Sequence, residues 1–224
     1  MLYSLKKNVL PVIVLCILAF VFSSCACLRN SSCVSTGVCA SKSFLVNSGF
    51  EEKESADDTP VGWDKTVLPQ YTEYVEFILD DTTARRGHNS ISIRISDAFP
   101  ATDPIHFNWH TDCTTLQEDK VYELSCHVKG KNLKESAWVC VQCWDKSNND
   151  MLNFATTQEE YTAKGTFGWK KVRALFSVPA GTSNITVRAG LSAPANKNGR
   201  VWFDEIQISE VKTRSIGVPK QTLH

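Results

Sequence analysis

The sequence predicts an all-β fold in which antiparallel sheets form a sandwich or barrel. Short runs that alternate apolar and polar residues are frequent, whereas the three-and-four spacing of an amphipathic helix is scarce. Clusters of glycine, proline and asparagine separate these runs. Because no helical crossover is predicted between successive strands, the strands should pair antiparallel, which is typical of sandwiches and barrels.

The clearest strands lie at 91–95 and 122–128. Three isoleucines in the first run alternate with polar residues, and four apolar residues in the second do the same, so each strand should bury one face. Further strands are expected at 74–79, 105–111, 138–144, 171–178, 184–191 and 200–211. Turns are expected at 86–89, 129–132 and 179–181. Trp63 and Trp169 each follow a glycine and are expected in the core.

Six motifs follow one another in a recognisable order. They are LVNSGFE at 45–51, PVGW at 60–63, GHNSISI at 87–93, a polar turn and Tyr-x-x-Ser strand within 116–130, GWKKV at 168–172 leading to FSVPA at 176–180, and VWFDEI at 201–206. In this order they resemble the CenC-type carbohydrate-binding modules, a branch of the galactose-binding-like jelly rolls. The resemblance covers nearly all of 43–211.

The resemblance implies a jelly-roll β-sandwich of two antiparallel sheets, with 45–51 as its first strand. It also implies a structural calcium ion that ties the first strand to the last, with Glu51 and Asp204 as side-chain ligands. Carboxylate and carbonyl oxygens are the ligands that calcium requires. The alternative is that both are solvated acids at strand ends.

Members of this family bind glycans on an open sheet face or at loop tips, through aromatic stacking and hydrogen bonds to hydroxyls. Alternation in 105–110 directs Phe107 and Trp109 inward, and in 138–144 it directs Val139 and Val141 inward. The outward residues are then the candidate carbohydrate-binding residues: His106, Asn108, Trp138, Gln142, Trp144 and Arg188. A slip of one residue would exchange the faces, leaving core packing or an ordinary solvated face as the alternative.

Metal and catalytic motifs are weak in this sequence. His106 and His110 lie four apart on a predicted strand, roughly 13 Å, too far to share one ion. The sequence contains no Gly-x-Ser-x-Gly, HExxH or P-loop motif. A glycoside hydrolase would need two facing carboxylates, and no spacing singles out a pair among Glu76, Asp80, Asp112 and Asp145.

The N-terminus predicts export. Lys6 and Lys7 precede an uncharged apolar run at 9–22, which is short for a membrane span and typical of a signal peptide over 1–24. The following FSSC at 22–25 resembles a bacterial lipobox, with Phe22 where an aliphatic residue is usual, and predicts lipidation of Cys25. Cleavage after Ala26, giving a secreted protein, and an uncleaved anchor are the alternatives.

A serine- and cysteine-rich tether is expected at 25–43, the β-sandwich at 44–211 and a loose tail at 212–224. Of the 9 cysteines, seven remain after Cys16 and Cys25 are set aside, and they are expected as disulfides or buried thiols. Cys140 and Cys143 have a CxxC spacing, but on a strand they should face opposite sides of the sheet.

Charge and composition narrow the function classes. Lysine plus arginine and aspartate plus glutamate are both 24, so no global field attracts nucleic acid, and a membrane is expected only through the lipid anchor. The leading hypothesis is a non-catalytic, polysaccharide-binding module at the cell envelope, near separate hydrolases or surface proteins. A protein-binding module at the cell surface is the alternative, and a small glycoside hydrolase or lyase a third.

Overall fold

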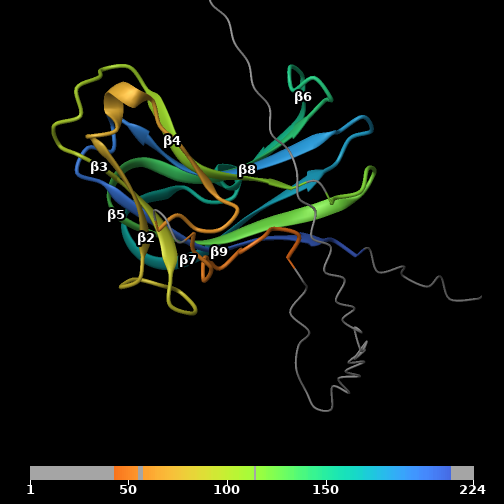
Figure 1. Ribbon diagram of the computed structural model, residues 1–224, viewed down its shortest axis with the longest axis horizontal. Coiled ribbons are helices and arrows are strands. Elements are labelled where there is room, and N and C mark those ends of the chain that lie inside the picture. Colours follow the sequence, from red (N-terminus) through yellow and green to blue (C-terminus); the bar gives the residue numbers. More distant parts are fainter. Residues whose placement is uncertain (1–42, 55–57, 114, 213–224) are drawn as a thin grey trace, which may run out of the picture. The chain divides into compact units, whose positions relative to one another are not determined.

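The computed structural model describes residues 43–54, 58–113 and 115–212, which are built almost entirely of antiparallel strands (Figure 1). The strands are β1 Asp64–Thr66, β2 Val75–Asp80, β3 Ser90–Ile95, β4 Ile105–Cys113, β5 Val121–Trp144, β6 Met151–Thr156, β7 Ala163–Ser177, β8 Asn184–Ala193 and β9 Arg200–Glu210. The short 3-10 helices are η1 Pro69–Tyr71 and η2 Thr157–Glu159. None of the helices in these residues is long and apolar enough to cross a membrane. The predicted signal peptide, the tether with Cys25 and nearly all of the tail lie outside the described residues.

Two five-stranded sheets face one another, and the long strand β5 belongs to both. Sheet I has the order β1-β4-β8-β5-β6, and sheet II has the order β7-β5-β9-β3-β2. The first half of β5 pairs with β7 and β9, and the second half pairs with β8 and β6. Figure 1 shows β8 and β6 in one layer and β7 and β9 in the other. The predicted fold, an all-β sandwich of antiparallel sheets, is confirmed.

The turn predicted at 129–132 is wrong, because β5 runs through it as one 24-residue strand. Gly130 pairs with both Phe167 and Val201. A Cβ atom at this position would overlap the ring of Phe167. The glycine therefore permits close packing inside a bulged strand, whereas the local pattern resembled a turn.

The strand predicted at 45–51 is also wrong, because this segment forms turns. Asn47 and Phe50 have φ angles of 46° and 62°, in the left-handed region that a strand excludes. The Asn47 side chain stabilises the turn by donating to the carbonyl of Glu52 at 2.6 Å. Phe50 is nevertheless buried and packs on Trp63 with ring centroids 5.2 Å apart, so the motif contributes to the core without forming a strand.

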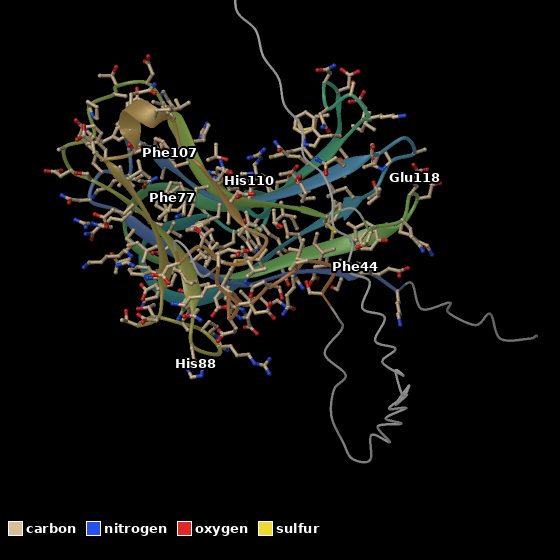
Figure 2. All side chains as sticks on the ribbon, viewed as in Figure 1. Phe44, Phe77, His88, Phe107, His110 and Glu118 are labelled. Carbon is tan, nitrogen blue, oxygen red and sulfur yellow. The ribbon has the colours of Figure 1, made fainter. Side chains whose placement is uncertain are left out.

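The core lies between the sheets and is made of the inward side chains that alternation predicts. Ile91, Ile93 and Ile95 of β3 face Phe107 and Trp109 of β4, and all five are fully buried. Figure 2 labels Phe107, which is fully buried, and Phe77, which is partly buried and packs against this core. The Trp109 indole N–H donates to the carbonyl of a serine in β3 at 3.2 Å, so the buried polar group has an acceptor.

Of the two tryptophans expected in the core, one is there. Trp63 is 2% exposed, which confirms its prediction. Trp169 is only partly buried, so its core prediction is wrong. It lies in the part of β7 between Ala163 and Val172, where no residue is fully buried because the strand extends past the core. Trp169 is therefore a surface tryptophan on sheet II.

Candidate functional site

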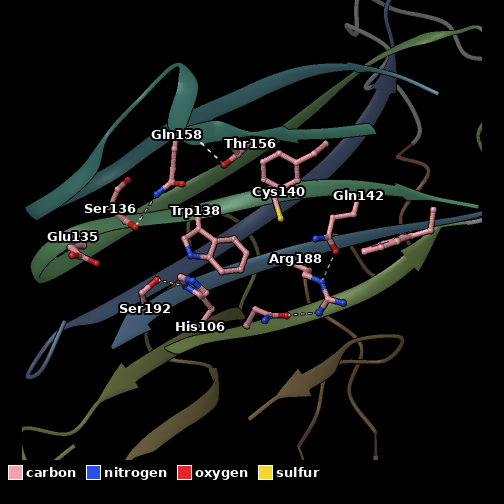
Figure 3. A pocket seen from close by; sticks show the side chains of 13 residues that line it. His106, Glu135, Ser136, Trp138, Cys140, Gln142, Thr156, Gln158, Arg188 and Ser192 are labelled. Carbon is pink, nitrogen blue, oxygen red and sulfur yellow. Dashed lines mark hydrogen bonds between the residues drawn. The ribbon is translucent and has the colours of Figure 1, made fainter. Parts of the chain in front are cut away.

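The outward side chains of sheet I line a cleft of about 750 Å³ (Figure 3). Strands β4, β8, β5 and β6 contribute to it, together with η2. Each of the six residues predicted from alternation lines this cleft: His106, Asn108, Trp138, Gln142, Trp144 and Arg188. The predicted strand phase is confirmed, since Val139, Val141 and Cys143 are buried on the opposite face. Their role in ligand binding stays a prediction.

Trp138 lies at the centre of the cleft floor. Its six-membered ring lies over Gly190 of β8, where a Cβ atom would overlap it. The ring of His106 meets Trp138 edge-on, with centroids 6.3 Å apart, and its Nδ1 atom is 2.7 Å from the hydroxyl of Ser192. Within the described residues, the indole N–H groups of Trp138 and Trp144 have no protein acceptor. Both rings are therefore free to contact a ligand.

A polar group lies beside these aromatics. The Arg188 Nε atom donates to the Gln142 side-chain oxygen at 2.9 Å, and Nη1 donates to the Asn108 side-chain oxygen at 3.0 Å. A longer bond of 3.4 Å joins Nη1 to the hydroxyl of Thr66 in β1. These bonds come from three different strands and hold the guanidinium in one place on the cleft floor.

One wall of the cleft comes from residues that sequence reasoning missed. Phe154 of β6 is 46% exposed and lies opposite Gln142, and Thr156 and Gln158 follow it along the wall. The pattern at 151–156 alternates too weakly to predict β6 without its partner strand. Other lining residues that were missed are Glu135, Ser136, Cys140 and Ser192.

The four cysteines in the described residues are buried free thiols: Cys113, Cys126, Cys140 and Cys143. Cys140 lines the cleft floor whereas Cys143 packs in the core, which confirms that the CxxC pair faces opposite sides. Burial raises the pKa of Cys140 to about 12 and that of Cys143 to about 11. Both are therefore protonated at neutral pH and do not have the low pKa of a redox CxxC.

A second hollow of about 300 Å³ continues from the cleft past Trp144 and Arg188, which line both. Its remaining lining is polar: His110, Asp112, Asn148, Asn184 and Thr186. Burial and the nearby charge of Arg188 lower the pKa of His110, which favours the neutral form of its ring. Together, the two hollows provide a polar and aromatic track along sheet I.

The two predicted calcium ligands both hold the loop between β2 and β3. Both Glu51 oxygens accept the backbone N–H of His88, at 3.0 and 3.1 Å. One Asp204 oxygen accepts the backbone N–H groups of Arg85 and Arg86, at 2.7 and 3.0 Å. Burial raises the pKa of Asp204.

The carboxylates of Glu51 and Asp204 do not fit a calcium site as arranged. Their oxygens accept backbone N–H groups, whereas calcium would need those oxygens, together with further oxygen ligands, to face the ion. Among the residues with described positions, no group of three or more His, Cys, Asp or Glu side chains could hold a metal ion. The calcium ion stays a prediction, and the two carboxylates act here as acceptors that anchor a loop.

The acids considered for catalysis are dispersed. Glu76 and Asp80 lie on sheet II, where they pair with Arg94 and Arg200. Asp112 lines the second hollow. Asp145 accepts a hydrogen bond from the Ser147 side chain, which lowers the pKa of Asp145. Glu135 is the one carboxylate among the residues that line the main cleft.

The β-sandwich is similar in fold to solved carbohydrate-binding modules. The xylan-binding domain CBM22-1 of Paenibacillus barcinonensis Xyn10C has a similar structure, with a TM-score of 0.51 at 18% identity, over 80% of this chain and all of that domain. A putative sugar binding protein from Bacteroides thetaiotaomicron has a TM-score of 0.53 at 14% identity, over 76% of this chain and all of that protein. These identities establish likeness of fold alone.

The same fold occurs within larger proteins. The enzymatically active domain of bacteriophage CBA120 tailspike protein 4 has a TM-score of 0.53 at 8% identity, over 75% of this chain and 21% of that one. Among curated proteins, the tRNA(Glu)-specific nuclease WapA of Bacillus subtilis subsp. natto is 25% identical over 184 residues, 81% of this chain. The chain spans only 7% of the length of that relative. No family model matches the chain.

Proposed function

We propose that this domain binds a polysaccharide chain, without cleaving it, in the cleft on the outer face of sheet I. One observation carries the proposal: two tryptophans, whose indole N–H groups have no protein acceptor among the described residues, lie in the same cleft as a fixed arginine and two amides. A sugar ring has an apolar face that stacks on an aromatic ring and hydroxyls that need hydrogen-bonding partners. The solved structures of like fold, one of them the xylan-binding domain CBM22-1 of Paenibacillus barcinonensis Xyn10C, support the same assignment.

The composition of the cleft favours a glycan over a protein as its ligand. A protein-binding patch is expected to have a contiguous apolar centre. In this cleft Asn108, Gln142 and Gln158 line the surface together with the aromatic side chains. Amides and aromatic rings in one cleft suit a sugar chain, which presents both apolar faces and hydroxyls.

The number of carboxylates in the cleft favours binding over catalysis. Glycoside hydrolysis generally uses two carboxyl groups on either side of the bond that is cleaved. In the described residues the main cleft has one, Glu135, and no second acid lines it. Export with a lipid on Cys25 would place such a module at the cell envelope, near separate hydrolases or surface proteins.

The test is retention of the full chain on polysaccharides, measured by affinity gel electrophoresis on a panel that covers neutral and acidic polymers, with calcium and with a chelator. Trp138→Ala and Trp144→Ala should each weaken binding about tenfold or more, since one lost stacking contact is worth about 1.4 kcal/mol. Trp169→Ala is the matched control, because Trp169 is a surface tryptophan outside the cleft.

Three results would contradict the proposal. A folded chain that no polysaccharide retains would overturn it, as would equal loss in the Trp169→Ala control. Retention of tRNA or of a surface protein by the same cleft, abolished by Trp138→Ala, would reassign the site to that ligand.

A further inference from the structure

Two arginines of the described residues are partly buried, Arg188 in sheet I and Arg200 in sheet II. Arg200 has a counter-ion, because its Nη2 atom lies 2.7 Å from a carboxylate oxygen of Asp80. Arg188 has none: within the described part of the chain no carboxylate lies within 4.0 Å of its guanidinium. A partly buried charge without a counter-ion is costly, so its presence on a cleft floor calls for an explanation.

The neutral partners of Arg188 position it and leave donors unused. Gln142 occupies Nε, whereas Asn108 and Thr66 occupy Nη1. The Nη2 atom has no protein acceptor among the described residues, so its hydrogens remain available. Figure 3 shows the guanidinium held between Gln142 and a neighbouring side chain on the cleft floor.

The location of Arg188 makes it a contact for whatever crosses the sheet. It lines both the main cleft and the second hollow, at their junction beside Trp144. A sugar chain that stacks on Trp138 and continues past Trp144 passes directly over this guanidinium. A sugar carboxylate complements a fixed guanidinium through a short, charge-assisted hydrogen bond.

We propose that the cleft recognises a polysaccharide containing uronic acid, with one sugar carboxylate bound to Arg188. This inference rests on the proposed carbohydrate-binding function and names the class of polysaccharide. The carboxylate accepts from Nη2 and supplies the counter-ion that Arg188 lacks.

The surrounding acids restrict how the negative charge is distributed along the polymer. Glu135 lies at one end of the main cleft and Asp112 in the second hollow, on either side of Arg188. Each would repel a sugar carboxylate placed next to it. The arrangement therefore fits spaced uronic acids on a mainly neutral chain better than a polymer that is acidic at every sugar.

The experiment compares matched pairs of polymers, each in its native acidic form and after chemical reduction of its carboxylates to alcohols. Glucuronoxylan provides the spaced charge, and polygalacturonate and alginate provide the continuous charge. The full chain should bind native glucuronoxylan at least tenfold more tightly than its reduced form, and more tightly than the continuously charged polymers. Raising salt from about 50 to about 500 mM should weaken only the binding of the acidic form.

Three variants test the role of Arg188. Arg188→Gln should lose the preference for the native polymer, Arg188→Lys should keep part of it, and Arg94→Gln, outside the cleft, should leave it unchanged. Equal binding of native and reduced polymers by the unmodified chain would overturn this inference and leave the proposed function standing. Absence of binding to every polymer, neutral ones included, would instead overturn the proposed function itself.

Discussion

The outer faces of the two sheets each present tryptophan and arginine, but they use them differently. On sheet II, Trp202 is 7% exposed, its N–H donates to Asp80 at 2.7 Å, and Arg200 and Lys129 lie over its ring at 4.6 and 5.1 Å. On sheet I, Trp138 lies in an open cleft, and no described residue accepts its N–H. The sheet II residues satisfy one another, whereas on sheet I the Trp138 N–H group and the Arg188 Nη2 atom have no protein acceptor among the described residues.

The comparison shows that residue type alone does not mark a binding face. Trp202 and Trp138 both point outward from a strand, and both lie beside an arginine. What separates them is the set of partners: Asp80 completes the group on sheet II, and no carboxylate completes the group around Arg188 in the described residues. Stability is therefore expected to depend on the sheet II group and ligand affinity on the sheet I group.

The largest expected effect is that of truncating the two tryptophans. Trp202→Ala should lower the free energy of unfolding by about 3–5 kcal/mol, because it removes a buried ring and leaves Asp80 short of a donor. Trp138→Ala should change it by no more than about 1 kcal/mol, since the cleft side of that ring has no protein contact. Urea unfolding of both variants measures the difference. Equal losses of stability in Trp202→Ala and Trp138→Ala would contradict the difference between the two faces.

Removing the charge of Asp80 comes next. Asp80→Asn should lower the free energy of unfolding by about 1–3 kcal/mol, because Arg200 loses its counter-ion while the Trp202 hydrogen bond can persist. Polysaccharide binding should stay unchanged, since Asp80 lies on the other sheet. Asp81→Asn, at an exposed neighbouring acid, is the control for a general loss of negative charge. A stable variant with weakened binding would contradict the comparison.

A substitution under the cleft should affect the ligand face. Gly190→Ala should lift the Trp138 ring from the sheet and weaken polysaccharide binding about tenfold, with a moderate loss of stability from overpacking. Gly168→Ala is the matched control, because a Cβ atom there has no heavy atom within 4 Å. Unchanged binding in Gly190→Ala would show that the position of Trp138 does not matter for the ligand.

The smallest expected effect is a pH dependence of the stability that the Asp80 carboxylate contributes on sheet II. Burial alone would raise the pKa of Asp80, but hydrogen bonds from Thr82 and Trp202 and the charge of Arg200 together hold it below its ordinary 3.8. The folded state thus binds the proton less tightly than the unfolded state. The stabilisation is fully present above pH 3.8 and is lost as the pH falls through the folded-state pKa.

The stability difference between the unmodified chain and Asp80→Asn should accordingly shrink as the pH falls from about 6 to below 3.8, as measured by thermal unfolding at each pH. A difference that stays constant over this range would show that the carboxylate charge contributes nothing to the sheet II group.

Much of the site could be read from the sequence because alternation along a strand is a local property. The pattern at 105–110 and 138–144 predicted which side chains share a face, and the structure places all six predicted residues in one cleft. Local patterns were misleading where long-range packing decides the backbone. Gly130 resembled a turn but lies within β5 against Phe167, and the first predicted strand, 45–51, forms turns that bury Phe50.

By itself, the sequence determined that this protein is built of antiparallel strands, and it predicted which residues face out in the strands at 105–110 and 138–144. Only the tertiary structure decided which strands are neighbours. Arg188 bonds to Gln142 and Asn108, which are 46 and 80 residues away in the sequence. The cleft wall with Phe154 forms because β6 pairs with β5. The physical reason is that side-chain direction follows from two successive residues, whereas strand pairing follows from the packing of the whole core.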